Sequence, residues 1–413
     1  MTAESPDLAG LAARLVAEAG DTAGDVHGSG TALAAAARLL GPRRNRQITL
    51  HDAAQLHLPA PTLAAAKVTR HFPPLPADAV LPPGFTRQSH LAETAAVRLQ
   101  RIPGGHLLHL AHAPVVLTAG ADKVVQDHSG RFAPLVNHVT ANLRLILDRA
   151  RMVPGRVFVL GDEIQPPNYC HWLLDALPRL DCLGSTDDCS SVSVAVAPLT
   201  APFQRETLHR CGFDDAHIVE LGPMQALRAD ELLVTSDLPD PPHPAFKAAA
   251  WALRFLRRRL GSPDPAGAGA GATPRRIYVS RADSAGRRVV NEDALLAALR
   301  PLGFVPVALA GMTVQAQAAL FADAEMIVGP HGAGLTNAVF APPGTGLLEL
   351  FPRSYGMATY YVLAMGARLT YDDLIFDDVV PGSRAQRDDM RVDVAQVVAR
   401  CHDMFRRRAA PGG

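Results

Sequence analysis

The C-terminal half of the chain alternates short apolar runs with segments of helical periodicity. Runs such as Arg276 to Ser280, Phe304 to Leu309 and Met326 to Val328 are mostly apolar, which is typical of strands buried on both faces of a sheet. Between them, apolar residues recur at helical spacing, for example from Glu292 to Leu299. This alternation predicts a parallel sheet covered by helices on both faces, the layout of doubly wound α/β proteins.

The same alternation extends over most of the chain after residue 139. Strands are expected at 156–160, 192–197, 218–221, 231–235, 276–280, 304–309, 326–328, 346–350 and 368–371. Helices are expected at 139–150, 169–177, 203–211, 245–260, 292–299, 314–321, 335–340 and 355–365. The fold class predicted from this order is α/β.

The N-terminal region has a different pattern. Its first forty residues are Ala-rich and helix-prone, whereas residues 47–131 contain short β-like pieces separated by Pro and Gly. Further along the chain, residues 261–274 form a low-complexity Gly/Ala/Pro segment, which marks a linker or an insertion. The predicted divisions are a helical extension (1–45), an N-terminal acceptor-side domain with a β-rich elaboration (46–260), the linker (261–274), a C-terminal nucleotide-sugar-binding domain (275–376) and a helical tail (377–413).

Composition narrows the class of protein. The 413 residues are enough for two to three domains, and 40 basic residues balance 40 acidic ones, so no global field favours nucleic acid or a membrane surface. Five scattered cysteines without a C-x-x-C pair favour reduced thiols, and we expect a cytoplasmic protein. The N-terminal apolar run is interrupted by Arg14 and Glu18, so we predict neither a signal peptide nor a transmembrane segment. Peripheral association with a membrane is left open.

The stretch EMIVGPHGAGLTN, Glu325 to Asn337, holds the strongest sign of a ligand site. Gly329 and Pro330 stop its apolar strand, and a helix is expected from Leu335. The turn between them has almost no side-chain bulk, so backbone N–H groups at the positive end of a helix dipole can approach an anion such as phosphate. Because the pattern is neither G-x-G-x-x-G nor a Walker loop, tight packing alone is the alternative.

Other polar residues follow neighbouring strands and are expected to gather near this turn, because ligands of parallel sheets bind at the carboxyl ends of strands. Arginines supply forked donors for phosphate oxygens, the turn supplies backbone donors, and an acid could accept ribose hydroxyl protons. The structural alternative pairs the arginines with nearby carboxylates. The predicted nucleotide-binding residues are Arg281, Arg287, Arg288, Asn291, His331, Gly332, Ala333, Gly334, Asn337 and Glu349.

A second candidate site lies in PPNYCHWLLDALPRL, residues 166–180. Asn168 is a good N-cap after the double proline, and the helix it starts carries His171 and Asp175 at positions i and i+4. A carboxylate beside a histidine fixes its tautomer and raises its basicity, so the pair could supply a general base and its orienting partner. A surface pair that merely stabilises the helix is the alternative, and a zinc site is less favoured because no H-E-x-x-H or third ligand is present.

Three further histidines, His106, His109 and His112, recur at a spacing of three. That spacing could suggest a metal site. The neighbouring leucines indicate a strand, however, and a strand places alternate residues on opposite faces. We therefore predict no metal site there.

Four motifs, in this order and spacing, resemble glycosyltransferase family 61: NYCHWLLDALPRL at 168–180, YVSRADSAGRRVVNE at 278–292, FADAEMIVGPHGAGLTN at 321–337 and LLEL at 347–350. The likeness covers residues 156–371. It implies a GT-B-like fold of two Rossmann-type parallel-sheet domains facing a cleft, a nucleotide-sugar donor that is usually UDP-linked, and inversion at the anomeric carbon. It also implies activity without a D-x-D metal motif, so no cofactor is expected.

The resemblance and the residues together predict the chemistry. The helix with His171 and Asp175 would deprotonate an acceptor hydroxyl, and either residue could take the proton. Arg281, Arg288 and the His331 turn would stabilise the leaving diphosphate without a cation. The expected partners are a nucleotide-sugar donor and a glycan or lipid-linked glycan acceptor, in surface or capsular polysaccharide synthesis.

Two alternative functions come from other classes of protein. A non-catalytic nucleotide-sugar-binding protein of the same fold is disfavoured because both His171 and Asp175 are present, and loss of the base is the simplest way to lose activity. An esterase is suggested by the HGAG sequence, which resembles an oxyanion loop. The absence of a G-x-S-x-G nucleophile elbow from the sequence argues against it.

Overall fold

The computed structural model describes residues 49–51, 56, 62–65, 68–71, 91–94, 97–110, 113–125, 146–161, 168–184, 191–235, 250–261, 275–380 and 388–409. The chain divides into two compact units. Unit 1 comprises Met1–Ala66, Ala96–Trp172 and Arg179–Leu238, and unit 2 comprises Lys67–Ala95, Leu173–Pro178 and Pro239–Gly413. The predicted N-terminal helices, and most of the predicted linker and of the predicted helix at 139–150, lie outside the described residues.

Unit 1 is built on a ten-stranded mixed sheet in which β12 (Gln225–Thr235) is a long shared strand. One edge of β12 pairs in parallel with β9 (Arg151–Val159), and β10 (Val192–Val196) and β11 (Ile218–Glu220) continue the parallel order. The other edge is antiparallel to β6 (His106–Leu110) and β5 (Val97–Pro103). The remaining strands are β1 (Thr49–His51), β2 (Thr62–Ala65), β7 (Ala113–Leu117) and β8 (Lys123–Val125).

The two halves of this sheet differ in burial as their sequences predict. Parallel β10 reads VSVAV, and four of its five residues are buried. Antiparallel β5 reads VRLQRIP and exposes Arg98, Arg101 and Pro103. A strand covered on both faces needs continuous apolar residues, whereas one with a solvated face alternates. The crossover from β10 to β11 is made by helix α5 (Pro202–Arg210).

Unit 2 contains a five-stranded parallel sheet in the order β14-β13-β15-β16-β17. The strands are β13 (Arg276–Val279), β14 (Phe304–Val307), β15 (Met326–Pro330), β16 (Gly346–Pro352) and β17 (Thr370–Phe376). The chain moves outward from β13 to β14 and then crosses back to β15 on the other side of β13. The direction of winding therefore reverses between β13 and β15, and in open parallel sheets this reversal is where ligands bind.

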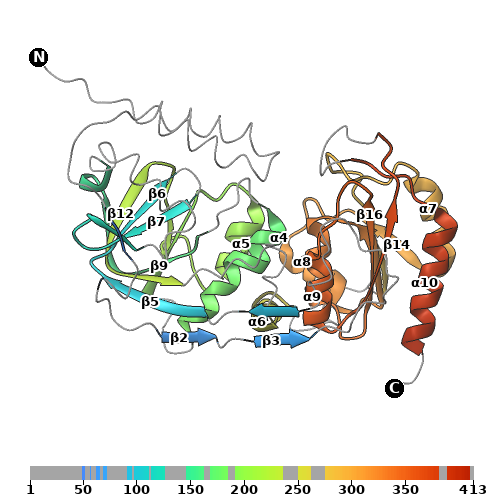
Figure 1. The fold of residues 1–413 in the computed structure, drawn as a ribbon, viewed down its shortest axis with the longest axis horizontal. Helices are drawn as coiled ribbons and strands as arrows, with labels where there is room; N and C mark the ends of the chain where they lie inside the picture. Colours follow the sequence, from blue (N-terminus) through green and yellow to red (C-terminus); the bar gives the residue numbers. More distant parts are fainter. Residues whose placement is uncertain are drawn as a thin grey trace, which may run out of the picture. The chain divides into compact units, whose positions relative to one another are not determined.

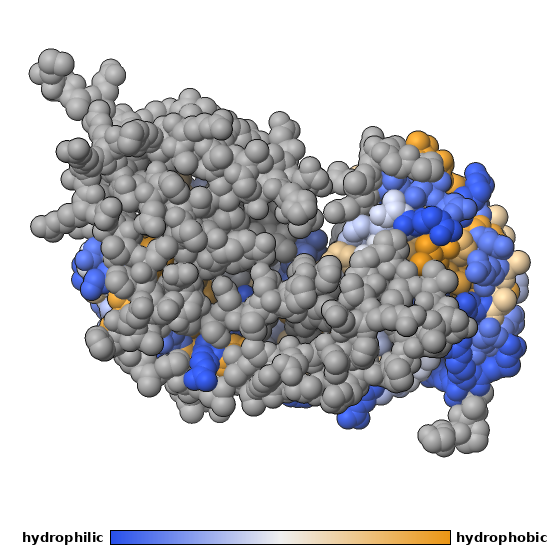
Figure 2. All heavy atoms as spheres, in the orientation of Figure 1, coloured by the Kyte–Doolittle hydropathy of each residue, from blue (hydrophilic) through white to orange (hydrophobic). Residues whose placement is uncertain are grey.

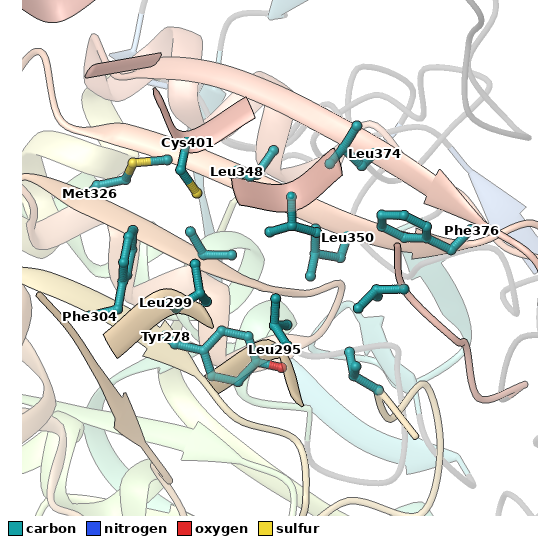
Figure 3. Close-up of a cluster of buried hydrophobic side chains, with 14 of the residues drawn as sticks. Tyr278, Leu295, Leu299, Phe304, Met326, Leu348, Leu350, Leu374, Phe376 and Cys401 are labelled. Atoms are coloured by element: carbon teal, nitrogen blue, oxygen red, sulfur yellow. The ribbon is translucent and has the colours of Figure 1, made fainter. Parts of the chain in front are cut away.

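Helices cover both faces of this sheet (Figure 1). One face packs against α7 (Glu292–Leu299) and α10 (Val394–Ala409), and Figure 3 shows the resulting core, with Tyr278, Leu348 and Leu350 among its buried side chains. The other helices are α6 (Ala250–Leu260), α8 (Val314–Ala322), the 3₁₀ helix η10 (Ala333–Phe340) and α9 (Thr359–Ala367). A two-stranded sheet, β3 (Val68–His71) with β4 (Leu91–Thr94), is grouped with unit 2.

The surface of unit 2 near α10 is mainly hydrophilic in the view of Figure 2. The last turn of α10 carries Arg406, Arg407 and Arg408, which complement the negative end of the helix dipole. Within the described ranges, no helix has the length and apolar character needed to cross a membrane.

The predicted α/β class with parallel sheets is confirmed, and helix 292–299 has the predicted bounds. Some boundaries differ. The predicted strand 231–235 is the end of the longer β12, and α9 begins at Thr359 rather than at residue 355. Strand β17 begins at Thr370, later than predicted, because Arg368 ends α9 in the left-handed conformation at φ 61°.

Candidate functional site

The candidate site of unit 2 forms where β13 and β15 end, at the reversal of strand order. Arg281 follows β13, and His331 and Gly332 follow β15. Gly332 has extended backbone angles, φ 171° and ψ 164°, which any residue can adopt. A Cβ atom at this position would nevertheless overlap the guanidinium of Arg281. The close approach of the arginine, and not the backbone conformation, therefore depends on glycine at this position.

Arg281 is held by its own loop. Its Nη2 donates to Ser284 Oγ at 2.6 Å and to the Gly286 carbonyl at 2.9 Å. Burial, together with the positive charge of Arg287, lowers the pKa of Arg281 to about 10. A half-buried guanidinium beside a second cation is stabilised by a bound anion.

Arg287 reaches the strand end from the other side of the same loop. It has a left-handed backbone at φ 56°, and its Nε donates to the His331 carbonyl at 3.1 Å. Its guanidinium carbon lies 4.8 Å from the centre of the Tyr355 ring, a cation–π contact. The structure thus brings Arg281, Arg287, His331 and Gly332 together, as the sequence predicts.

His331 is fixed from several directions. Its Nδ1 is hydrogen-bonded to Glu349 Oε1, and its ring stacks on Phe351 with a centroid distance of 5.1 Å and an angle of 25°. Tyr355 and Tyr360 contact the ring at centroid distances of 5.1 and 5.2 Å. Such packing allows the ring little freedom to rotate.

Glu349 is fully buried on β16. Its Oε1 is bonded to His331, and its Oε2 accepts from the Tyr371 hydroxyl at 2.7 Å. Both carboxyl oxygens are thus used inside the fold. The predicted contact of Glu349 with a ribose hydroxyl stays a prediction, and these contacts favour a supporting role.

Ala333, Gly334 and Asn337 lie in η10, which is a 3₁₀ helix and not the expected α-helix. Asn337 is fully buried, and its Nδ2 donates to Gln317 Oε1 at 2.7 Å and to the Gly334 carbonyl at 3.1 Å. Gln317 in turn donates to the Met312 carbonyl at 3.1 Å. These contacts hold the glycine-rich turn beside the loop after β14. Gln317 was not among the predicted site residues, and its signal was weak, because α8 also contains Gln315.

Arg288 and Asn291 connect to a different segment. Arg288 Nη2 donates to Asp389 Oδ2 at 2.7 Å, and its side chain is 51% exposed. Asn291 exchanges two hydrogen bonds with the backbone of Val392, at 2.9 and 3.0 Å. Both residues tie the loop before α7 to residues 388–392. Their predicted contact with a nucleotide stays a prediction.

The second candidate pair lies on the segment after Asn168. The N-cap is confirmed, because Asn168 Oδ1 accepts from Cys170 N at 2.9 Å. The predicted single α-helix is instead a short α-helix, α4 (Tyr169–His171), a π-helix, η4 (Trp172–Ala176), and a 3₁₀ helix, η5 (Leu177–Leu183). His171 ends the α-helical part, and Asp175, which is 9% exposed, lies in the π-helical part.

Aromatic contacts anchor this segment to α5 in unit 1. Trp172 Nε1 donates to Thr207 Oγ1 at 2.8 Å, and the Tyr169 and Phe203 rings meet edge to face at 5.2 Å. Single π-helical turns inside helices are frequent at functional sites. The anchoring and the π turn are consistent with a precisely placed polar pair, whose role stays a prediction.

Over the described ranges, no cluster of three or more His, Cys, Asp or Glu side chains could hold a metal ion. His106 and His109 are both buried in β6, and His106 Nδ1 bonds the Thr118 carbonyl at 3.2 Å. His112 lies outside the described residues. Metal independence stays a prediction.

Residues 169–348 match the family model described as Glycosyltransferase 61. The match covers less than half of the chain and confirms the resemblance to this family seen in the motifs.

A curated relative, the β-1,2-xylosyltransferase XAX1 of Oryza sativa subsp. japonica, is 37% identical over 125 residues. The match covers 28% of this chain and only 22% of the relative. A solved structure, the bacterial iron-containing dodecameric glycosyltransferase TibC from enterotoxigenic E. coli H10407, aligns over 73% of this chain and 82% of its own. Its 9% identity and TM-score of 0.26 are too low to support any conclusion.

Proposed function

We propose that this protein is an inverting glycosyltransferase that moves a sugar from a nucleotide-sugar donor, UDP-linked, to a hydroxyl group of a glycan. The observation that carries the proposal is the placement of Arg281, Arg287 and the His331–Gly332 turn at the strand reversal of unit 2. Two cationic side chains and a backbone stripped of side-chain bulk suit a diphosphate, the leaving group of such donors.

In the proposed reaction the acceptor oxygen attacks the anomeric carbon in one displacement. The bond between that carbon and the phosphate oxygen breaks, and its electron pair stays on the diphosphate. Arg281 and Arg287 offset this charge, so no metal ion is required. The acceptor proton passes to a base, for which His171 and Asp175 are the proposed residues.

The proposal includes the GT-B arrangement of two parallel-sheet domains that the family resemblance implies. It also includes a glycan or lipid-linked glycan acceptor, a role in surface or capsular polysaccharide synthesis, and a cytoplasmic location. The xylosyltransferase named among the relatives makes a xylose-carrying donor a natural member of any substrate panel.

Donor screening tests the proposal. The purified protein is incubated with a panel of UDP- and GDP-sugars with and without an acceptor mixture, release of UDP or GDP is measured, and each nucleotide is ranked by thermal shift. We expect one nucleotide diphosphate to raise the melting temperature and its sugar to be consumed. No shift and no release with any donor would contradict the proposed function.

A further inference from the structure

A hydrogen-bonded chain crosses three adjacent strands beside the candidate site. Tyr371 on β17 donates to Glu349 on β16, and Glu349 is bonded to His331, directly after β15. The strand register permits this, because Pro330 lies opposite Leu350 and Glu349 opposite Asp373. The fold therefore fixes which ring nitrogen of His331 faces the carboxyl group.

The other ring nitrogen of His331, Nε2, has no such partner in the described part of the chain. His331 is only 6% exposed, yet Nε2 makes no hydrogen bond with any described residue. Nε2 is not one of the fully buried polar atoms that lack a partner in the described residues, so it keeps some exposure and is open to a ligand. The His331 carbonyl is held by Arg287, and the next residue, Gly332, lies against Arg281, so cationic groups surround this histidine.

The location of the proton decides what Nε2 can do. Burial raises the pKa of Glu349 well above its usual value, while the Tyr371 hydrogen bond and the charge of Arg287 oppose this. Burial also lowers the pKa of His331, as do Arg287 and Arg281. Both directions favour a neutral acid beside a neutral imidazole. In that form the Glu349 hydroxyl donates to Nδ1, and the ring proton is on Nε2.

We propose that His331 is a catalytic residue that donates its Nε2–H to an oxygen of the leaving diphosphate, and that Glu349 is the positioning residue that selects this tautomer. The inference rests on the proposed function. As the bond to the anomeric carbon breaks, the phosphate oxygen gains the electron pair and the hydrogen bond strengthens. The proton stays on the imidazole throughout.

Other titratable groups also face this histidine or its partner. Arg281 and Arg287 come from the loop after β13, and Tyr355 and Tyr360 lie against the ring. Asp373 lies opposite Glu349 on β17. Burial raises the pKa of Asp373 as well, so burial favours the protonated form of both carboxyl groups.

Two variants separate the roles of the ring nitrogens. His331→Asn can keep an acceptor, its Oδ1, near the Nδ1 position but has nothing at Nε2. Glu349→Gln mimics the neutral acid, because its amide N–H can donate to Nδ1 and its carbonyl can accept from Tyr371. Calorimetric titration with UDP, or with GDP if UDP does not bind, should show binding at least about tenfold weaker for His331→Asn and within about twofold of wild type for Glu349→Gln.

A second measurement reports the tautomer of His331 directly in the wild-type protein. Long-range ¹⁵N–¹H correlation spectra of ¹⁵N-histidine-labelled wild type should show the His331 signal, assigned by its absence in His331→Asn, as the Nε2–H tautomer near neutral pH. An Nδ1–H tautomer, or wild-type affinity in His331→Asn, would overturn this inference and leave the proposed function standing. Binding of neither UDP nor GDP by the wild type would overturn the proposed function and this inference with it.

Discussion

Two histidines, one in each unit, are predicted to take part in the reaction, and their surroundings differ. His331 is buried, bonded to a carboxyl group from the neighbouring strand, and stacked on an aromatic ring. His171 is half-buried at the end of a short α-helix, where the chain changes to a π-helix. A ring with its donor direction fixed suits binding of one anion. A less enclosed ring suits exchange of a proton with an incoming hydroxyl.

The two histidines also differ in how the fold brings each one to its carboxyl partner. His171 and Asp175 are four residues apart, so local helix geometry relates them. His331 and Glu349 are 18 residues apart and meet through the pairing of β15 with β16. The second pair is therefore as rigid as the sheet, and the first is as rigid as one irregular helix.

The largest expected effect concerns the His171 region. His171→Ala and Asp175→Asn should each lower turnover by at least about a hundredfold, the usual scale for loss of a general base, while UDP binding stays near wild type. If the two residues act as one unit, the double variant should be no slower than the worse single variant. Near-normal turnover in both single variants would leave the pair with a structural role only.

The next effect separates two arginines of one loop. Arg281→Ala should weaken UDP binding at least about tenfold, because a charge-assisted contact in a half-buried site is lost. Arg288→Ala is the matched control, since its guanidinium is exposed and paired with Asp389, and its loss should change affinity by less than about fivefold. Calorimetry measures both, and equal losses would place Arg288 in the site as well.

A smaller effect concerns stability at the same strand ends. Burial raises the pKa of Asp373 to about 7, the charge of Asp372 adds to the shift, and Arg400 opposes it. The folded protein then binds this proton more tightly than the unfolded chain, so the free energy of unfolding falls as pH rises from about 4 to about 7 and stays low above it.

Asp373→Asn should remove this fall. Its melting temperature relative to wild type should rise by about 5–10 °C between pH 5 and pH 8, the shift expected for about 2–3 kcal/mol. Differential scanning calorimetry measures the change. A constant difference across this range would show that Asp373 does not titrate there.

The smallest expected effect is that of chelation. The arginines and the turn are proposed to take the place of a cation, so turnover should be unchanged in EDTA. Assays of donor consumption with and without chelator measure this. Loss of activity that manganese or magnesium restores would identify carboxylates as metal ligands.

The sequence predicted the parts of this structure that depend on local pattern. Apolar runs located the strands of unit 2, and Asn168 identified the start of helix α4 in unit 1. The position of the arginine loop beside the HGAG turn followed from a general rule for parallel sheets. The family resemblance added the class of enzyme, which no single motif could give.

Features that depend on register or packing could not be predicted. The contact between Tyr371 and Glu349 requires the alignment of β16 with β17, and nothing in either sequence segment specifies it. The bond between Gln317 and Asn337 joins two helices across a turn. The π turn after His171 breaks the α-helical spacing that was assumed for Asp175. Local secondary-structure propensity carries little information about such tertiary contacts.

The central claim is that the ends of β13 and β15 bind a nucleoside diphosphate, and UDP titration of Gly332→Ala tests it most directly. The extended backbone tolerates alanine, but the added methyl group displaces the Arg281 guanidinium. Gly222→Ala in unit 1, where a Cβ would meet only the Gln225 side chain at 3.3 Å, is the matched control. We predict at least about tenfold weaker binding for Gly332→Ala and unchanged binding for Gly222→Ala, with similar melting temperatures. Wild-type affinity in Gly332→Ala would contradict the claim.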